Sequence, residues 1–290
     1  AQDKFKDYDF EGSGMNILLD TLAYNTHYMA FNANMIANEM FLDSSSLRSS
    51  AVSHAKMLGY EVTSARAPKA IVNVNLTTDD ATKTLAAGTA FTTTVDGVSY
   101  QFVTIADRSA ANSGNVVTFD SVDIYEGTYV IGKSIVDTSN PDQKFTLTDP
   151  NADTSTLTVK VQNSSSDTGT TTYTKATDIT QLNSSSTVYY LQEAERGRFE
   201  VYFGDGVVSK ALTNGNIVIL SYVVTNKGVA NGVSTFSSST AIDGVTDVVV
   251  TTVSGAVGGA EPETVDSIKL NAPLNYSAQG RAVTTSDYEV

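Results

Sequence analysis

The residue types that most often carry catalysis are scarce in this sequence. Its 290 residues contain no cysteine and only two histidines, His27 and His54. Without cysteine there is no disulfide, no thiolate zinc site and no cysteine nucleophile, and two histidines argue against a multi-histidine metal site. No serine or cysteine motif accompanies either histidine. We therefore predict no catalytic residue, no metal and no cofactor, and expect His54 to be a hydrogen-bonded packing residue.

Acidic side chains are the next candidates, because the chain carries 32 of them. Hydrolysis of a glycoside needs two carboxylates that face each other across a cleft, and spacing along the sequence does not establish that arrangement. Solvated acids are far commoner than buried ones. The pairs concerned are Asp79 with Asp80, Glu193 with Glu195, and Glu261 with Glu263. We expect these side chains to be solvated rather than catalytic.

Alternating oxygen-bearing residues offer a possible calcium site. Asp149, Asn151 and Asp153 are spaced two residues apart, as the first ligands of an EF-hand loop are. The rest of that loop is missing. We therefore predict no calcium site.

The segment Phe203-Gly-Asp-Gly206 follows an expected strand and has two interpretations. As a functional loop it would present Asp205 as an acid or a ligand. As a hairpin turn it would use Gly204 and Gly206 for their access to positive φ. No basic residue and helix follow, so it is not a phosphate loop. We interpret Gly204, Asp205 and Gly206 as a structural turn.

The charge balance excludes two classes of partner. The chain has 18 basic and 32 acidic residues, a net charge of −14. A nucleic-acid backbone requires clustered Lys and Arg, and an anionic membrane surface also attracts basic segments. The apolar stretches are too short to span a membrane. We expect neither nucleic acid nor a membrane as a partner.

The elements that position these residues begin with a long helix. Apolar residues recur at helical spacing from Met15 to Leu42, with no Pro or Gly between them. Ser13 is a possible N-cap. A helix of this length runs about 40 Å, more than a small domain needs to cover its own core. The residues that we expect to face partner helices are Leu18, Leu22, Met29, Ile36 and Met40.

A second, shorter helix follows the break at residues 43–46. Leu47, Ala51 and Leu58 lie on one face of it, and Gly59 is placed for a left-handed C-cap. The two helices make a hairpin whose apolar face has few partners in its own segment. We expect this face, including these three residues, to pack on other chains or on another domain.

Between Tyr60 and Gly259 the apolar residues recur at every second position, which indicates strands. Threonine is abundant, as on strand surfaces. The pattern predicts an antiparallel β middle of sandwich-like or barrel-like layers. Residues 151–187 are rich in Ser and Thr. They form either an inserted β lobe or a disordered loop, and the strand-like pairs within them favour the lobe.

Helical character returns near the carboxyl end. Thr264 could cap a helix that Pro273 interrupts. Thr284 or Thr285 could cap another, which would begin just before the sequence stops at Val290. So short a helix is unstable alone, and we expect the natural polypeptide to continue.

These patterns predict an α+β multidomain fold. It has an N-terminal helical hairpin, a mainly antiparallel β middle with an inserted β lobe, and the start of a C-terminal helical region. We divide the chain into a bundle-forming segment (1–59), a β domain (60–135 and 188–259), an inserted lobe (136–187) and the start of a truncated C-terminal domain (260–290).

Three blocks of sequence resemble baseplate proteins of contractile-tailed phages. The first is similar to the N-terminal helical segment of T-even-type baseplate wedge proteins, and the second to the β domain of the wider baseplate J-like family. The third resembles the boundary where that family's C-terminal domain begins. The first block comprises residues 25–28, 34–43 and 47–60, the second residues 87–91, 96–102, 203–206 and 214–218, and the third residues 258–264 and 280–288.

The resemblance implies a structural role in the virion without chemistry. Such proteins form the inner ring of the tail baseplate around the hub and take part in the switch that triggers sheath contraction. Two copies associate within each wedge, their N-terminal helices join a bundle with another wedge subunit, and neighbouring wedges are linked. Assembly takes place in the host cytoplasm.

Two other functions remain open from the residues themselves. The Thr-rich β middle and the tyrosine content suit a glycan-binding adhesin or a virion decoration protein. A carboxylate-based hydrolase acting through Asp205 or Glu195 is the third alternative.

Overall fold

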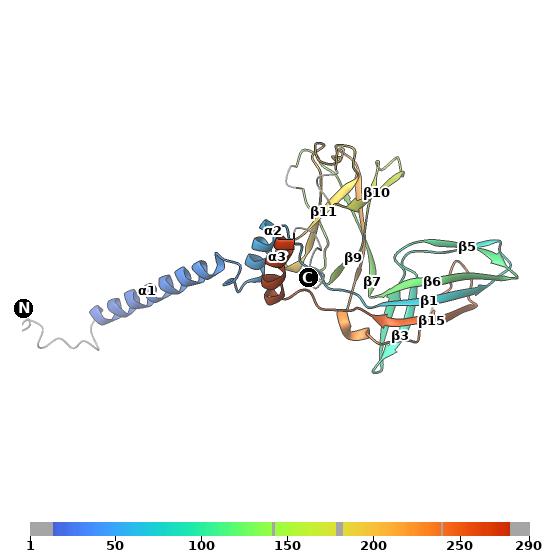
Figure 1. Cartoon of the computed structure of the whole chain (residues 1–290), viewed down its shortest axis with the longest axis horizontal. Helices are drawn as coiled ribbons and strands as arrows, with labels where there is room; N and C mark the ends of the chain where they lie inside the picture. The colour runs from blue at the N-terminus through green and yellow to red at the C-terminus, as the bar shows by residue number, and fades with distance from the viewer. Residues whose placement is uncertain (1–13, 141–142, 178–181, 239, 279–290) are drawn as a thin grey trace, which may run out of the picture. The chain divides into compact units, whose positions relative to one another are not determined.

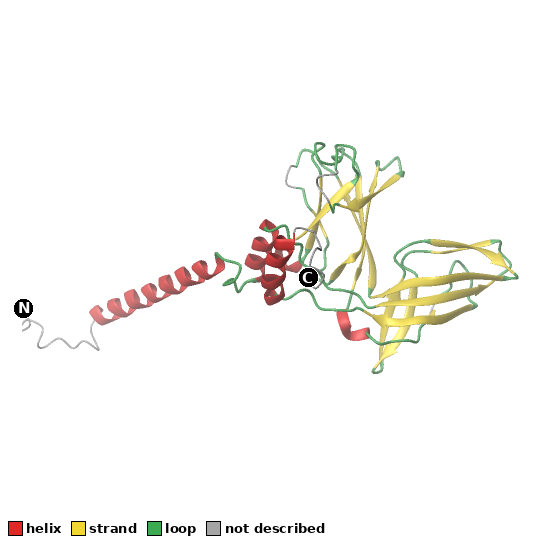
Figure 2. Cartoon of the chain, viewed as in Figure 1, coloured by secondary structure: helices red, strands yellow, loops and turns green. Residues whose placement is uncertain are grey.

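The computed structural model describes residues 14–140, 143–177, 182–238 and 240–278. They form two compact units (Figure 1). One unit comprises the chain up to residue 60 and from residue 264 onward, and the other comprises residues 61–263. Among the described residues, the α-helices belong to the first unit and the strands to the second, which also contains the short 3-10 helix η4 (Lys227–Ala230) (Figure 2). The predicted α+β class, with helices towards both ends and an antiparallel middle, is confirmed.

The helical unit contains α1 (Gly14–Glu39), α2 (Arg48–Met57) and α3 (Val265–Ala278). Its core lies where α2 contacts α3. The buried side chains of α2 are those of Ala51, Val52 and Ala55, and those of α3 are Ile268 and Ala272. Small residues on α2 allow the two helices to pack closely.

The ends of α2 and α3 follow the sequence signals. Gly59 has φ +75° just beyond α2, as a left-handed C-cap requires. Thr264 caps α3, because its Oγ1 accepts a hydrogen bond from Ser267 N at 3.2 Å. The interruption predicted at Pro273 is wrong: α3 continues through it to Ala278. Packing of α3 on α2 offsets the one backbone hydrogen bond that a proline removes. Ser13 and residues 284–290 lie outside the described residues.

The first β-sheet of the second unit has eight antiparallel strands in the order β14-β3-β4-β6-β1-β15, with β2 and β5 attached beside β6. Strand β14 also contacts β15, so the sheet curls until its two margins approach each other. Its core includes Phe91, Phe102 and Ile124. The strands are β1 (Lys69–Thr77), β2 (Thr82–Leu85), β3 (Ala90–Val95), β4 (Val98–Val103), β5 (Arg108–Ser113), β6 (Val116–Glu126), β14 (Ser237–Ser238) and β15 (Val248–Val257).

The second sheet has seven strands in the order β7-β13-β9-β10-β11-β12-β8. One pair, β10 with β11, is parallel, and the others are antiparallel. Buried side chains from both halves of this sheet form one cluster, so the sheet folds over its own core. The strands are β7 (Thr128–Ile135), β8 (Phe145–Thr146), β9 (Ala152–Gln162), β10 (Thr170–Lys175), β11 (Val188–Glu193), β12 (Phe199–Phe203) and β13 (Ile217–Val224).

Residues 136–187, expected as an inserted lobe, contribute strands to the second sheet. They supply β8, β9 and β10, and β9 pairs with β13 from much later in the chain. Their serine-rich runs make turns: Ser164 Oγ accepts a hydrogen bond from Asp167 N at 3.0 Å after β9. The composition reflects turn chemistry and exposed strand faces.

Two buried carboxylates join the two sheets. Glu126, at the end of β6, accepts hydrogen bonds from Thr225 Oγ1 (2.7 Å) and from Asn226 N (2.9 Å) and Nδ2 (2.7 Å), just after β13. Asp153, at the start of β9, accepts one from Ala67 N at 2.8 Å, just before β1. Because each carboxylate is buried and satisfied by neutral donors, the two sheets are held together at these points.

Candidate interaction surface

Helix α1 exposes apolar side chains along its whole length. None of its residues is buried, and its large apolar side chains are between 42% (Met35) and 72% (Met29) exposed. Exposed hydrophobic patches of this extent mark interaction sites in soluble proteins. A helix of 26 residues is about 39 Å long.

One apolar stripe on α1 contains the residues predicted from the sequence. Its members alternate at spacings of three and four residues, which is the pattern of a helix that packs lengthwise on another helix. We call this stripe the first seam, and it comprises Met15, Leu18, Leu22, Asn25, Met29, Asn32 and Ile36. Met40, also predicted to face a partner, lies just beyond α1 and is exposed.

A second stripe on α1 was missed by the sequence reasoning. Its members also alternate at three and four residues, and we call it the second seam. It comprises Ile17, Thr21, Tyr24, Tyr28, Phe31 and Met35. Tyr24 and Tyr28 touch edge to face with ring centroids 4.5 Å apart, and their hydroxyls are hydrogen-bonded at 2.8 Å. The signal was present in the sequence, since the spacing repeats that of the first seam.

The two seams face different directions. At 100° per residue they are separated by about a third of the helix circumference. A single straight neighbour covers one such stripe, so covering both requires two neighbouring helices. The first seam is mainly aliphatic with two asparagines, and the second is mainly aromatic.

The turn between α1 and α2 is fixed by a carboxylate. Glu39, the last residue of α1, accepts hydrogen bonds from Ser46 N (2.8 Å), Ser46 Oγ (2.6 Å) and Leu47 N (3.3 Å). Hydrogen bonds from Ser46, and then from Ser50, lower the pKa of Glu39 to about 2. His54 Nε2 lies 3.0 Å from the Glu39 carbonyl oxygen. The end of α1 therefore holds the two backbone N–H groups that immediately precede α2.

The three residues of the second helix that were expected to face a partner differ in their surroundings. Leu47 is exposed and Leu58 is half-buried. Ala51 is fully buried in α2, which packs on α3 of the same chain. Ala51 thus packs against another helix of its own chain, which is the second of the two expected arrangements.

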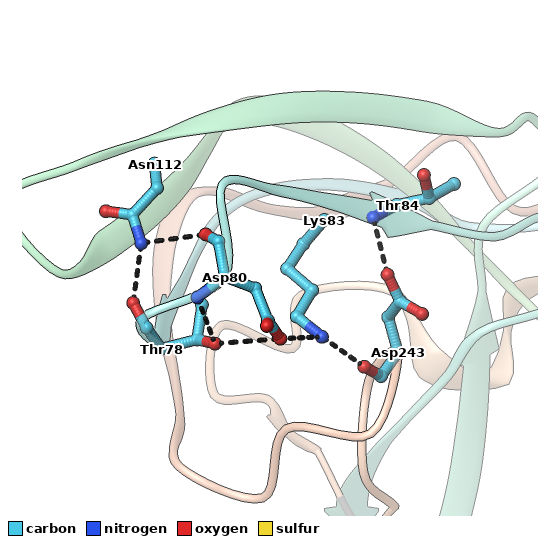
Figure 3. A network of polar contacts seen from close by, with 6 residues as sticks. All are labelled: Thr78, Asp80, Lys83, Thr84, Asn112 and Asp243. Atoms are coloured by element: carbon cyan, nitrogen blue, oxygen red, sulfur yellow. Dashed lines mark hydrogen bonds and ion pairs between the residues drawn. The ribbon is translucent and has the colours of Figure 1, made fainter.

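The acidic residues singled out from the sequence serve local structure. The Lys83 ammonium lies 2.7 Å from an Asp80 carboxylate oxygen and donates to the Asp243 carbonyl at 2.8 Å (Figure 3). The carboxylate of Asp243 accepts a hydrogen bond from Thr84 N at 3.0 Å. Hydrogen bonding and charge from Lys83 lower the pKa of Asp80. This network fixes the loop carrying Asp243 against β2.

Three more of these acids are also paired with protein groups. Asp149 accepts from Asn151 N at 2.8 Å, Glu261 is paired with Lys227, and Glu263 accepts from Thr63 N at 3.1 Å. Within the described ranges, no group of three or more acidic or histidine side chains is placed to hold a metal ion. In those same ranges, no helix has the length and apolar character to cross a membrane.

The Phe203–Gly206 segment makes a tight turn. Gly206 has φ +89° and donates to Ser209 O at 2.9 Å. A side chain on Gly204 would collide with Ser209. Hydrogen bonds from the backbone N–H groups of Val207 and Val208 lower the pKa of Asp205, so its carboxylate is used to close the turn.

Comparison with known proteins relates the chain to phage baseplates. Residues 1–60 match the family model of the helical domain of gp6-like baseplate wedge proteins, and residues 134–234 match that of the third domain of bacteriophage baseplate wedge protein gp6. Together these matches span more than half of the chain. The second match runs through the Ser/Thr-rich stretch and on into β11, β12 and β13.

A curated relative is the baseplate wedge protein gp6 of Enterobacteria phage T4. It is 30% identical over 321 aligned residues, which cover 100% of this chain and 47% of the relative. The chain thus spans about half the length of that protein. Among solved structures, a chain in the cryo-EM structure of the anti-feeding prophage baseplate covers 98% of this chain and 56% of its own length, at 14% identity. Its TM-score of 0.31 is too low for the folds to be compared.

Proposed function

The chain belongs to the gp6-like family of bacteriophage baseplate wedge proteins, and from this membership we propose that it is a structural subunit of a contractile tail baseplate. It acts as a scaffold in the virion and catalyses no reaction. The family match favours this role over the glycan-binding and hydrolase alternatives. Asp205, one of the two carboxylates of the hydrolase alternative, is engaged in a turn.

The observation that carries the proposal is the exposure of both seams of α1. Full burial of a large apolar side chain contributes about 1.5–3 kcal/mol. Because about half of each such side chain on α1 is still exposed, the two seams together offer on the order of 10 kcal/mol. Association itself costs about 4–15 kcal/mol. One seam alone offers about half of this gain, near the lower end of the association cost, so the proposal has both seams covered in the assembled bundle.

In this proposal α1 joins a bundle with helices of other wedge subunits. A second copy of the chain lies within each wedge, and the wedges are linked into the inner ring around the tail hub. The ring changes shape in the switch that triggers sheath contraction. Support for these finer steps comes from the resemblance to T-even-type wedge proteins and from the bundle-forming helix.

Replacing Leu22 with Asp tests the bundle. A charge in the first seam should abolish co-purification with the partner wedge subunit, because it cannot be desolvated without a counter-charge. The β unit should stay folded, with its thermal transition unchanged. Asn34→Asp is the matched control, since it adds the same charge to an exposed position of α1 outside both seams. Undiminished co-purification of the Leu22→Asp chain would show that the bundle assignment is wrong.

A further inference from the structure

A second exposed apolar surface lies on the outer face of β7. Val130 packs against the core of the seven-stranded sheet and Val136 is buried in it. The alternate residues Ile131, Lys133 and Ile135 are exposed instead, Ile131 at 55% and Ile135 at 66%. Outward-facing positions of a strand are usually polar, so two isoleucines here need an explanation.

The same face continues onto the two neighbouring strands. Ile217 is paired with Ile135, and Ile219 is paired with Lys133 on one side and with Lys160 on the other. Neighbouring strands lie about 4.8 Å apart, so the two lysines are about 10 Å apart with an isoleucine between them. We call this surface the isoleucine–lysine face. It comprises Ile131, Lys133, Ile135, Lys160, Ile217 and Ile219.

The face ends at an open sheet edge. Within the described residues β7 is paired only with β13. Val136 N donates to Asn216 O at 2.8 Å, and because the hydrogen-bonding direction alternates along an antiparallel strand, Ile131 and Lys133 direct their backbone groups away from β13. The Ile135 carbonyl accepts a bond from Gln143 Nε2 at 2.6 Å. The backbone N–H and C=O groups of Ile131 and Lys133 can therefore pair with another strand.

The charge of the face is opposite to that of the chain. The whole chain carries −14, yet the six residues of the face include two lysines and no acid. Neither lysine makes an ion pair with another described residue. Complementarity therefore calls for a partner that brings carboxylates between apolar side chains.

We propose that the isoleucine–lysine face binds an extended acidic segment of another baseplate subunit, which adds to the edge of β7 as a further strand. The inference rests on the proposed function for the source of that segment. A second copy of the chain is not the occupant. Pairing β7 with β7 of a copy would bring a strand that also carries Lys133 and no acid, so it would not supply the complementary carboxylates.

Site-specific photo-crosslinking tests this proposal. The photoreactive amino acid p-benzoylphenylalanine replaces Ile131 in the full chain during phage assembly, and crosslinked peptides are sequenced by mass spectrometry. Val98 is the matched control, because it is an equally exposed valine (54%) in the other sheet. We expect the Ile131 position to crosslink one segment of a different subunit, with Asp or Glu within three residues, which the Val98 position does not reach.

Charge variants complete the test. Lys133→Glu with Lys160→Glu should lower the crosslink yield at least tenfold, and Lys133→Arg with Lys160→Arg should leave it within twofold. Equal thermal transitions of the two variants establish that both fold. The proposal is overturned by no crosslink above the Val98 control, by a crosslink to a second copy or to a segment without acids, or by a yield that charge reversal leaves unchanged. Leu22→Asp distinguishes failure of this inference from failure of the proposed function. Only if the proposed function is wrong does the Leu22→Asp chain still co-purify with the partner wedge subunit.

Discussion

At the scale of single residues, carboxylates in this protein act as acceptors for backbone and hydroxyl groups. Glu39 caps the start of α2, Asp205 closes its own turn and Glu126 joins two sheets. Each of these side chains is a carboxylate, a group that can also act in acid–base catalysis. Their partners are N–H and O–H donors of the fold, so these carboxylates serve local structure.

The depressed pKa of Glu39 gives a pH dependence with a definite sign. Its pKa is about 2 in the folded chain and near 4.5 ordinarily. A lowered folded pKa stabilises the capped turn above pH 4.5, and this contribution is lost as the pH falls from about 4.5 towards 2. We expect the amide of Ser46 to lose protection from hydrogen exchange in that window. Glu39→Gln should remove this pH dependence, whereas titration of Glu39 near 4.5 would contradict the capping geometry.

Gly127 is a position where only glycine fits. Its φ is +126°, and an added Cβ would collide with the backbone carbonyl of Val224. We expect Gly127→Ala to lower the free energy of unfolding by about 3 kcal/mol, from backbone strain and the collision. Gly97→Ala is the control, since Gly97 has φ +82° with open space around its Cβ position and should lose only about 1 kcal/mol. Urea unfolding that ranks the two variants equally would refute the steric argument.

At the scale of elements, local signals were sufficient for the helices. Helical spacing without Pro or Gly predicted residues 15–42, and α1 spans Gly14–Glu39. Gly59 and Thr264 marked helix ends correctly because a left-handed residue and a hydroxyl acceptor act locally. The second seam followed the same rule and was overlooked. The exposed apolar residues of α1 were thus largely predictable as one stripe, whereas the neighbour of Ala51 was not, since its burial depends on α3 from the far end of the chain.

The order of the strands within each sheet could not be predicted from the sequence. Strand β13 lies between β7 and β9 although about 50 residues separate β9 from β13 along the chain, and β10 pairs in parallel with β11. Such pairings depend on long-range contacts that periodicity does not encode. The Ser/Thr-rich composition of residues 151–187 suggested an inserted lobe. Turn residues can be recognised in a sequence, whereas the pairing partners of a strand cannot.

The junction between the sheets allows a prediction at this scale. Glu126→Ala leaves three donors of Thr225 and Asn226 without an acceptor. We expect a loss of about 3–5 kcal/mol in the free energy of unfolding. Glu126→Gln keeps the shape and one acceptor and should lose less. Chemical denaturation followed by probes in each sheet measures both quantities, and an Ala variant as stable as the parent would show that the carboxylate does not hold the junction.

At the scale of the whole molecule, the chain combines a β unit that buries its own core with a helix that the described residues leave uncovered. The β unit has two buried cores, and α1 has none. Most of the stability of a helix in a protein comes from tertiary packing of its apolar face, and no residue of α1 is buried by the described residues. We therefore expect contacts with other subunits to stabilise α1, as the proposed scaffold role requires.

Hydrogen exchange along α1 tests this claim most directly. The amides of residues 18–39 are compared in the monomeric chain and in the complex with its neighbouring wedge subunits, with β1 as the internal reference. We predict little protection of α1 in the monomer, at least a hundredfold increase in protection in the complex, and no change in β1. Strong protection of α1 in the isolated monomer would contradict the account, because the helix would then be stable without foreign subunits.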